Sequence, residues 1–99
     1  MPSIQSVATA VPEHRVDQDT ARDFARDLFA DRIAGLDRLL PLFTHAGIAA
    51  RHFVVPPSWF RERHDLAERS ALYTEAATAL SARAACDALA EAGLGADQV

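Results

Sequence analysis

One long, alanine-rich helix constrains this chain more than any other feature of its sequence. Small and apolar residues return every three, four or seven positions, which is the spacing of a single helix face. These residues are Leu66, Tyr73, Ala77, Leu80, Ala84 and Ala88. Asp65 stands where an N-cap is expected and Gly93 where a helix-ending glycine is expected, so the sequence predicts a helix over residues 66–92. Its Ala-rich face has little side-chain bulk, which favours burial inside a layered fold.

The length of this predicted helix bears on the fold class. At a rise of 1.5 Å per residue the helix measures roughly 40 Å. A compact chain of 99 residues has a radius of gyration of about 13 Å and therefore a diameter of about 33 Å. Because the helix is longer than that globule, we expect the chain to be the N-terminal part of a larger α/β protein.

The N-terminal stretch predicts a strand and then an amphipathic helix. Residues 3–10 contain apolar and β-branched side chains and are followed by Pro12, a pattern that indicates a short strand. Asp17 is placed to cap a helix over residues 18–30, whose apolar side chains keep the spacing of one buried stripe. Two i,i+3 ion pairs are expected on the opposite side of this helix, Asp19–Arg22 and Asp23–Arg26.

The middle of the chain predicts a second helix and a second strand. Leucine and phenylalanine residues at positions 36, 39, 40 and 43 repeat a helical spacing, so we expect a helix over residues 36–46. Pro41 has no amide hydrogen, and the helix therefore either kinks there or begins near Leu40. Gly47 is placed to end it, and residues 48–55 read as a strand that stops at two prolines. Ser58 is expected to cap the short turn that follows.

The two predicted strands are isolated from each other in the sequence. No hairpin turn joins them, and a strand without a partner leaves its backbone hydrogen-bonding groups unsatisfied. This observation again favours a piece of a larger α/β protein over a self-contained domain.

Composition excludes several classes of protein. The formal net charge is −4, and the ten cationic residues, all of them Arg, alternate with acidic residues instead of forming a basic patch. A strongly basic nucleic-acid-binding domain is therefore excluded. No run approaches the ~20 apolar residues of a membrane span, and no secretory leader is recognisable at Met1. We expect a cytoplasmic protein, and the single cysteine excludes an internal disulfide scaffold.

Few residues have a pattern that indicates chemistry. Cys86 lies in the middle of the predicted long helix, with no neighbouring histidine to stabilise a thiolate, and is interpreted as a small packed side chain. The four histidines lack the spacing of a zinc site, so no metal is expected. No covalently bound cofactor is expected either. Residues 62–65, Glu-Arg-His-Asp, could supply an acid and a base but are more typical of a solvated helix junction.

Arg38 and His45 lie seven positions apart on the second predicted helix. Both should point away from its apolar stripe. An arginine can bind phosphate through two parallel hydrogen bonds, and a protonated histidine adds another donor. The spacing alone is nevertheless more typical of an ordinary solvated face.

Three stretches in this order resemble the N-terminal region of type III polyketide synthases, the chalcone and stilbene synthase-like enzymes. They are SIQSVATAVPEHRVDQDT at 3–20, FTHAGIAARHFVVPPSWF at 43–60 and ERSALYTEAATALSARAACDALAEAGL at 68–94. The resemblance runs through nearly all of residues 1–99, which it identifies as the N-terminal part of a thiolase-like domain. Other thiolase-like condensing enzymes, such as 3-oxoacyl-acyl-carrier-protein synthase III, share the opening strand and the Ala-rich helix.

The resemblance implies a homodimeric acyltransferase that loads a starter acyl-CoA onto a cysteine and extends it with malonyl-CoA. A histidine and an asparagine of the family assist decarboxylation and stabilise negative charge. This chain has no asparagine, and Cys86 falls at an ordinary packing position of the family. The resemblance therefore places no catalytic residue within the chain and predicts that the chain alone is inactive.

The resemblance does place part of the CoA entrance within the chain. The family uses three basic residues on the second helix to hold the CoA phosphates, and their positions here are Arg38, Pro41 and His45. Arg38 keeps the positive charge, His45 carries it only partly near neutral pH, and Pro41 has lost it. Two alternatives remain: a condensing enzyme that depends on acyl-carrier protein, and a small helical interaction module without chemistry.

Overall fold

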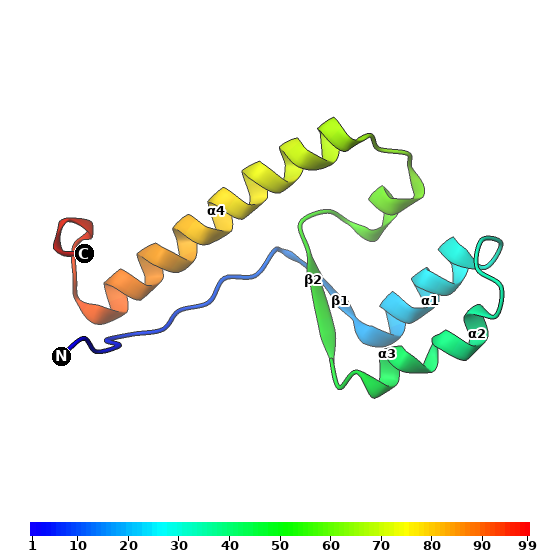
Figure 1. Ribbon diagram of the computed structural model, residues 1–99, viewed down its shortest axis with the longest axis horizontal. Helices are drawn as coiled ribbons and strands as arrows, with labels where there is room; N and C mark the ends of the chain where they lie inside the picture. Colours follow the sequence, from blue (N-terminus) through cyan, green and yellow to red (C-terminus); the bar gives the residue numbers. More distant parts are fainter. The chain divides into compact units, whose positions relative to one another are not determined.

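The computed structural model describes residues 1–99 and divides into two compact units. One unit is Pro12–Arg63, and the other combines Met1–Val11 with His64–Val99. Helices and one small antiparallel sheet make up the structure (Figure 1). The expected mixture of helix and strand is therefore present, whereas the layered thiolase-like fold is not visible in the chain alone. None of the helices combines the length and apolar content needed to cross a membrane.

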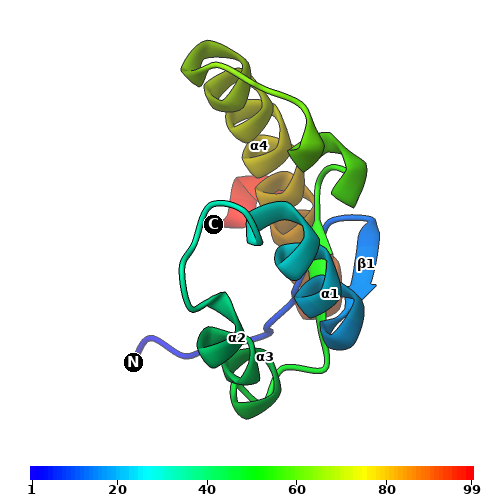
Figure 2. The same cartoon turned by 90° about the vertical axis from the view of Figure 1, so that its right-hand side faces the viewer.

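The unit Pro12–Arg63 holds both strands and most of the short helices (Figure 2). Its elements in chain order are β1 His14–Asp17, α1 Gln18–Phe29, α2 Leu36–Leu39, α3 Pro41–His45, β2 Ala50–Phe53 and the 3-10 helix η1 Pro57–Arg61. Strand β2 confirms the core of the strand predicted over 48–55. The short turn after it is also present, but Ser58 is not its cap, because Pro56 occupies that position and no side chain caps the turn.

The sheet pairs β1 with β2, and this pairing was not predicted. The strands run antiparallel, with His14 opposite Phe53 and Asp17 opposite Ala50. The strand predicted over residues 3–10 is wrong, because that segment forms no ladder with any other part of the chain. The expectation that both predicted strands would lack partners is wrong for β2, which pairs with β1.

Helix α1 forms as its local sequence dictates. The Asp17 carboxylate accepts a hydrogen bond from the Thr20 backbone N–H at 2.8 Å and another from the Thr20 hydroxyl at 2.9 Å. Both predicted ion pairs are present, Asp19 with Arg22 at 3.5 Å and Asp23 with Arg26 at 3.4 Å. The predicted helix over 18–30 is confirmed, and it ends one residue earlier than expected.

The core of this unit is small. Its buried apolar side chains are Val16, Ala21, Leu40 and Val55. An aromatic cluster extends it, in which the Phe60 ring lies edge-on to Phe24 at 6.4 Å, Phe53 at 5.7 Å and Trp59 at 5.2 Å between ring centroids. These contacts hold η1 against α1 and the sheet.

The second unit consists of helix α4, the extended N-terminal segment and a terminal turn. Helix α4 spans Leu66–Ala92, as predicted, and the Asp65 carboxylate caps it by accepting from the Glu68 backbone N–H at 2.8 Å. Gly93 ends it with φ +69°, a left-handed conformation that glycine adopts without steric cost. The 3-10 helix η2, Ala96–Gln98, follows.

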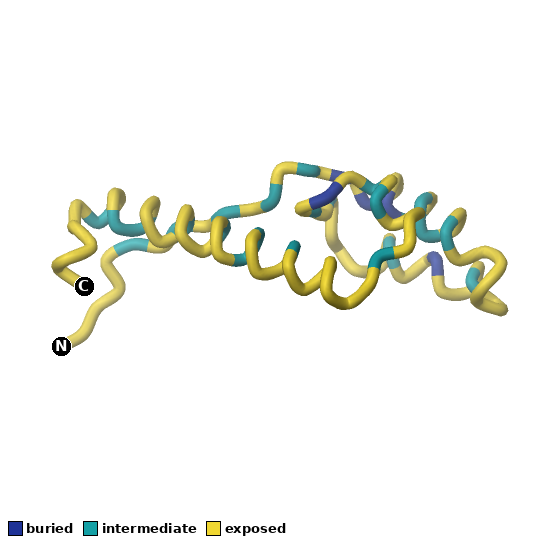
Figure 3. The backbone as a smooth tube through the Cα atoms, turned by 90° about the horizontal axis from the view of Figure 1, so that it is seen from above, coloured by how far each residue is buried: buried dark blue, intermediate teal, exposed yellow.

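The extended segment Met1–Val11 lies along α4 and is held by two hydrogen bonds. The Ser6 hydroxyl donates to the Ala88 carbonyl at 2.6 Å, and the Arg83 guanidinium donates to the Val11 carbonyl at 2.6 Å. No residue of α4 is buried (Figure 3), and the side chains of Leu66 and Tyr73 are 77% and 74% exposed. The expected burial of the Ala-rich face is therefore not found within this chain.

Candidate functional site

The candidate site lies on the helical pair α2 and α3, which the sequence divides at Pro41. Leu40 keeps helical dihedrals, φ −57° and ψ −35°, and its amide donates to the Leu36 carbonyl at 3.1 Å. Pro41 has no amide hydrogen to continue this ladder, so α2 ends before it and α3 begins with it. The sequence predicted an interruption at this position, and the structure contains it as two short helices placed end to end.

Leu40 is the most deeply buried residue on the apolar side of the pair. Leu40 is only 5% exposed, and Leu36 and Phe43 are half-buried. Leu39, which the periodicity also placed on the buried stripe, is 48% exposed. The pair is thus anchored at its centre, where the two helices meet.

Arg38 and His45 both lie on the solvent side of this pair. Arg38 belongs to α2 and His45 is the last residue of α3, and both side chains are exposed without a hydrogen bond or ion pair. Seven helical residues correspond to a separation of about 10 Å along the axis and a rotation of about 20°. The helical geometry therefore places the two side chains on one face.

Pro41 occupies the third position of this face without contributing charge. It is the first residue of α3 and is exposed. The residue that interrupts the helix is therefore also an uncharged position between Arg38 and His45.

One buried residue that supports the end of α3 was not identified from the sequence. Gln18 is buried, with 6% of its surface exposed, and it is the only polar residue in that class. Its side-chain amide donates to the Phe43 carbonyl at 2.8 Å, and its side-chain oxygen accepts from Arg51 Nε at 3.0 Å. Nothing local in the sequence signals these contacts, because the partners lie 25 and 33 positions away.

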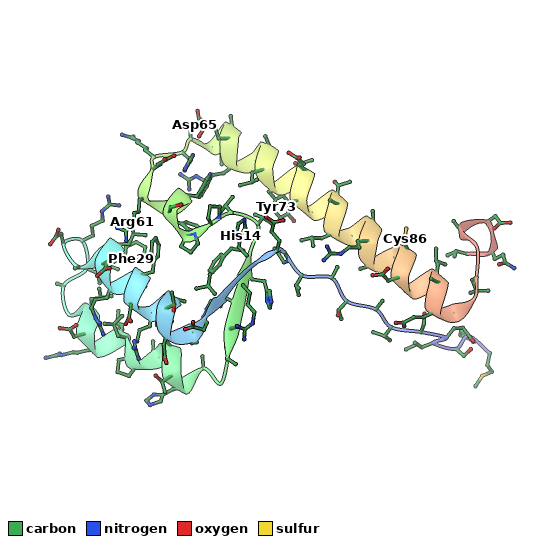
Figure 4. The ribbon with its side chains drawn as sticks, turned by 180° about the vertical axis from the view of Figure 1, so that it is seen from behind. His14, Phe29, Arg61, Asp65, Tyr73 and Cys86 are labelled. Atoms are coloured by element: carbon green, nitrogen blue, oxygen red, sulfur yellow. The ribbon has the colours of Figure 1, made fainter.

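The cysteine, the potential metal ligands and the acid–base residues at 62–65 do not gather into a site. Cys86 is exposed in the C-terminal third of α4 (Figure 4), so its interpretation as a packed side chain is wrong within this chain. No group of three or more potential metal ligands is present. His64 Nδ1 lies 3.1 Å from a Glu68 carboxylate oxygen, and Asp65 caps α4, so the junction at 62–65 organises the start of that helix.

The pKa of Asp17 is displaced from its ordinary value. The Thr20 backbone N–H donates to its carboxylate and lowers the pKa below its ordinary value, and the Thr20 hydroxyl adds to the effect. This displacement reflects helix capping, and Asp17 is fully exposed, so it does not indicate a catalytic acid.

An apolar pocket of about 300 Å³ opens in the unit Pro12–Arg63. Its lining combines α1, the sheet and η1, and includes Phe24, Leu28, Phe43, Phe53 and Phe60. Two guanidinium groups stand against its rings, Arg51 over Phe43 at 5.6 Å and Arg61 over Phe24 at 4.9 Å. Such cation–π contacts stabilise the rim while leaving the interior apolar.

Comparison with known proteins gives two relatives. The chain is 37% identical over 75 residues to a putative chalcone synthase of Bacillus subtilis (strain 168), an alignment covering 76% of this chain and 20% of that protein. It is 32% identical over 92 residues to 1,3,6,8-tetrahydroxynaphthalene synthase of Streptomyces peucetius subsp. caesius, covering 93% of this chain and 24% of that protein.

The chain therefore spans about a fifth to a quarter of the length of these relatives. No protein-family model matches the sequence, and no solved structure matches it.

Proposed function

Because the chain is homologous over most of its length to type III polyketide synthases, we propose that it forms the N-terminal region of such an enzyme. The complete enzyme would condense a starter acyl-CoA with malonyl-CoA units in the cytoplasm, as a homodimer. The observation that carries the proposal is the identity of 37% over 75 residues to a putative chalcone synthase.

Within this enzyme, Arg38 and His45 would hold the phosphates of the CoA substrates. Three features support this role: both side chains are exposed, both are free of protein partners, and both lie on one face of the α2 and α3 pair. A guanidinium suits a phosphate because it donates two parallel hydrogen bonds. A protonated histidine adds a further charged donor.

The chain would not carry the chemical steps itself. It contains no asparagine, and its one cysteine is exposed in mid-helix without a base beside it. The nucleophile and its partners would therefore come from the rest of the enzyme, and we expect no acyltransferase activity from residues 1–99 alone. Determining the gene sequence downstream of codon 99 tests this directly: a continuing frame that encodes a cysteine, a histidine and an asparagine supports the proposal, and a stop codon there contradicts it.

The role of Arg38 is tested in the full-length enzyme with two substrates. Arg38→Ala is expected to raise the KM for acyl-CoA about fivefold, equivalent to about 1 kcal/mol for an exposed charge pair, and to leave the KM of a short acyl thioester without the nucleotide unchanged. The acyl-CoA effect should shrink as salt is added. Arg32→Ala is the matched control, because Arg32 is exposed in the same unit and has no side-chain partner. Equal effects on both substrates would remove Arg38 from the site.

A condensing enzyme that takes its substrates from acyl-carrier protein is the alternative within the same fold. It would prefer an acyl group carried by the protein over the same group carried by CoA. In that enzyme the Arg38→Ala variant should lose affinity for the carrier protein, so comparing the two carriers separates the two proposals.

The apolar pocket favours one further candidate, a helical interaction module. In this case the pocket, with Arg51 and Arg61 at its rings, would receive apolar side chains of a partner protein. Phe60→Ser would then abolish partner binding, whereas Arg38→Ala would have no effect on it. Acyl-CoA turnover by the full-length protein would exclude a module without chemistry.

A further inference from the structure

Gln18 connects three separate elements of the unit Pro12–Arg63. It is the first residue of α1, and its backbone N–H donates to the Ala49 carbonyl at 2.9 Å. Its side-chain amide donates to the Phe43 carbonyl in α3, and its side-chain oxygen accepts from Arg51 Nε in β2. A buried polar side chain with every group satisfied fixes the geometry of its partners, since breaking any bond leaves a buried group unpaired.

The orientation of the Gln18 amide follows from its partners. The Arg51 guanidinium can only donate and the Phe43 carbonyl can only accept, so the side-chain oxygen must face Arg51 and the nitrogen must face Phe43. Neither bond could form if the amide were reversed. The contact is therefore specific for an amide at position 18.

The bond to Phe43 holds the end of α3. The last carbonyls of a helix have no amide partner within the helix, and α3 is only five residues long. The Gln18 nitrogen supplies a donor to one of these carbonyls, while the Arg51 guanidinium covers the Phe43 ring at 5.6 Å. His45 lies two residues beyond Phe43, so its position depends on this last turn.

We propose that Gln18 is a positioning residue for His45, and through it for the phosphate end of the CoA substrate; this inference rests on the proposed function. Gln18 does not touch the ligand. It holds the C-terminal turn of α3, and the Arg51 bond holds Gln18. Arg38 depends on Gln18 far less, because it lies in α2, on the other side of the Leu40 anchor.

Two substitutions in the full-length enzyme separate the bonds. Gln18→Glu keeps an oxygen for Arg51 and loses the donor to Phe43, whereas Gln18→Met has similar length and loses both. Both variants are expected to raise the KM for acyl-CoA about threefold, the scale of one neutral hydrogen bond. The kcat and the KM for a short thioester lacking the nucleotide should not change. Gln5→Glu is the matched control, because Gln5 is exposed and lies in the other unit.

A double-mutant cycle distinguishes positioning from general destabilisation. When Gln18→Glu is combined with His45→Ala, the KM effects should be non-additive, because the position of an absent side chain no longer matters. When it is combined with Arg38→Ala, the effects should add. Thermal melting of every variant identifies any that fail to fold, and the milder Gln18→Glu is then the informative one.

The outcomes test the two proposals separately. If Arg38→Ala and His45→Ala leave the KM for acyl-CoA unchanged, the proposed site fails. If those two variants raise it but both Gln18 variants behave like the wild type, the positioning role of Gln18 is overturned while the site stands. Additivity of Gln18→Glu with His45→Ala would also overturn it.

Discussion

Residues 1–99, produced without the rest of the larger enzyme proposed above, should not fold cooperatively. In the unit that contains α4, Leu66 and Tyr73 are 77% and 74% exposed, and in the unit Pro12–Arg63, Leu39 and Leu42 are 48% and 61% exposed. The unit that contains α4 has no buried residue at all, and the buried apolar residues of the other unit number four.

The energetic weight of this exposure can be estimated from the side chains themselves. Burying one large apolar side chain contributes about 1.5–3 kcal/mol. The four side chains named above, each about half to three-quarters exposed, therefore represent roughly 4–8 kcal/mol of burial that the chain does not obtain, as an upper bound. This amount is comparable to the entire stability of a typical domain, ~5–15 kcal/mol.

Circular dichroism and dye binding on the isolated polypeptide test this estimate. We expect helical far-ultraviolet spectra from α4 and α1, a weak near-ultraviolet signal from Trp59 and Tyr73, a broad melt and strong binding of an apolar dye. Measurement at several protein concentrations separates monomer from self-associated material. A sharp melt of a monomer that binds no dye would refute the reasoning and remove the structural support for a larger enzyme.

Two further predictions concern the unit Pro12–Arg63 within the full-length protein. Leu40→Ala should lower the free energy of local opening of α2 and α3 by about 2–3 kcal/mol, because it removes three nearly fully covered carbons and leaves a cavity. Amide hydrogen exchange measures this free energy, and unchanged exchange would contradict the prediction. The Asp17 carboxylate should stabilise α1 at pH values above its unfolded pKa, and this stabilisation should be lost as the pH falls through its lower folded pKa. Asp17→Ala should therefore remove this acid-dependent step from the amide exchange of α1.

The long helices could be predicted because their determinants are local. The caps Asp17 and Asp65 and the terminal Gly93 act within one turn of the backbone they stabilise. The interruption at Pro41 is equally local, since it follows from one missing amide hydrogen. These signals can be read without knowing what lies beside the helix.

The strands could not be predicted in the same way, because a strand exists only with its partner. Residues 3–10 have the composition of a strand and an extended backbone, yet no ladder partner within the chain. Residues 14–17, His-Arg-Val-Asp, have little strand character and nevertheless pair with β2. Tertiary context decided both cases against local propensity.

Arg38 and His45 were chosen as candidate site residues from a resemblance that placed cations on the second helix. Both are exposed, Arg38 in α2 and His45 in α3, and their binding role stays a prediction. The support from Gln18 could not be foreseen, because its role depends on a carbonyl and a guanidinium distant in sequence. A polar residue at the start of an amphipathic helix is ordinarily taken for a solvated one.

The exposed apolar surfaces and the polar network of Gln18 together bear on which proposal is stronger. Uncovered apolar area is required both by a piece of a larger enzyme and by a module that binds a partner, so α4 and the aromatic pocket do not separate the two. The Gln18 network does not separate them by itself, because its partners Phe43 and Arg51 also line the apolar pocket. The two proposals differ in what they require of His45: a phosphate site requires its donors at fixed places, whereas a module that binds through the pocket makes no use of His45. The double-mutant cycle of Gln18→Glu with His45→Ala therefore separates the CoA entrance from the interaction module.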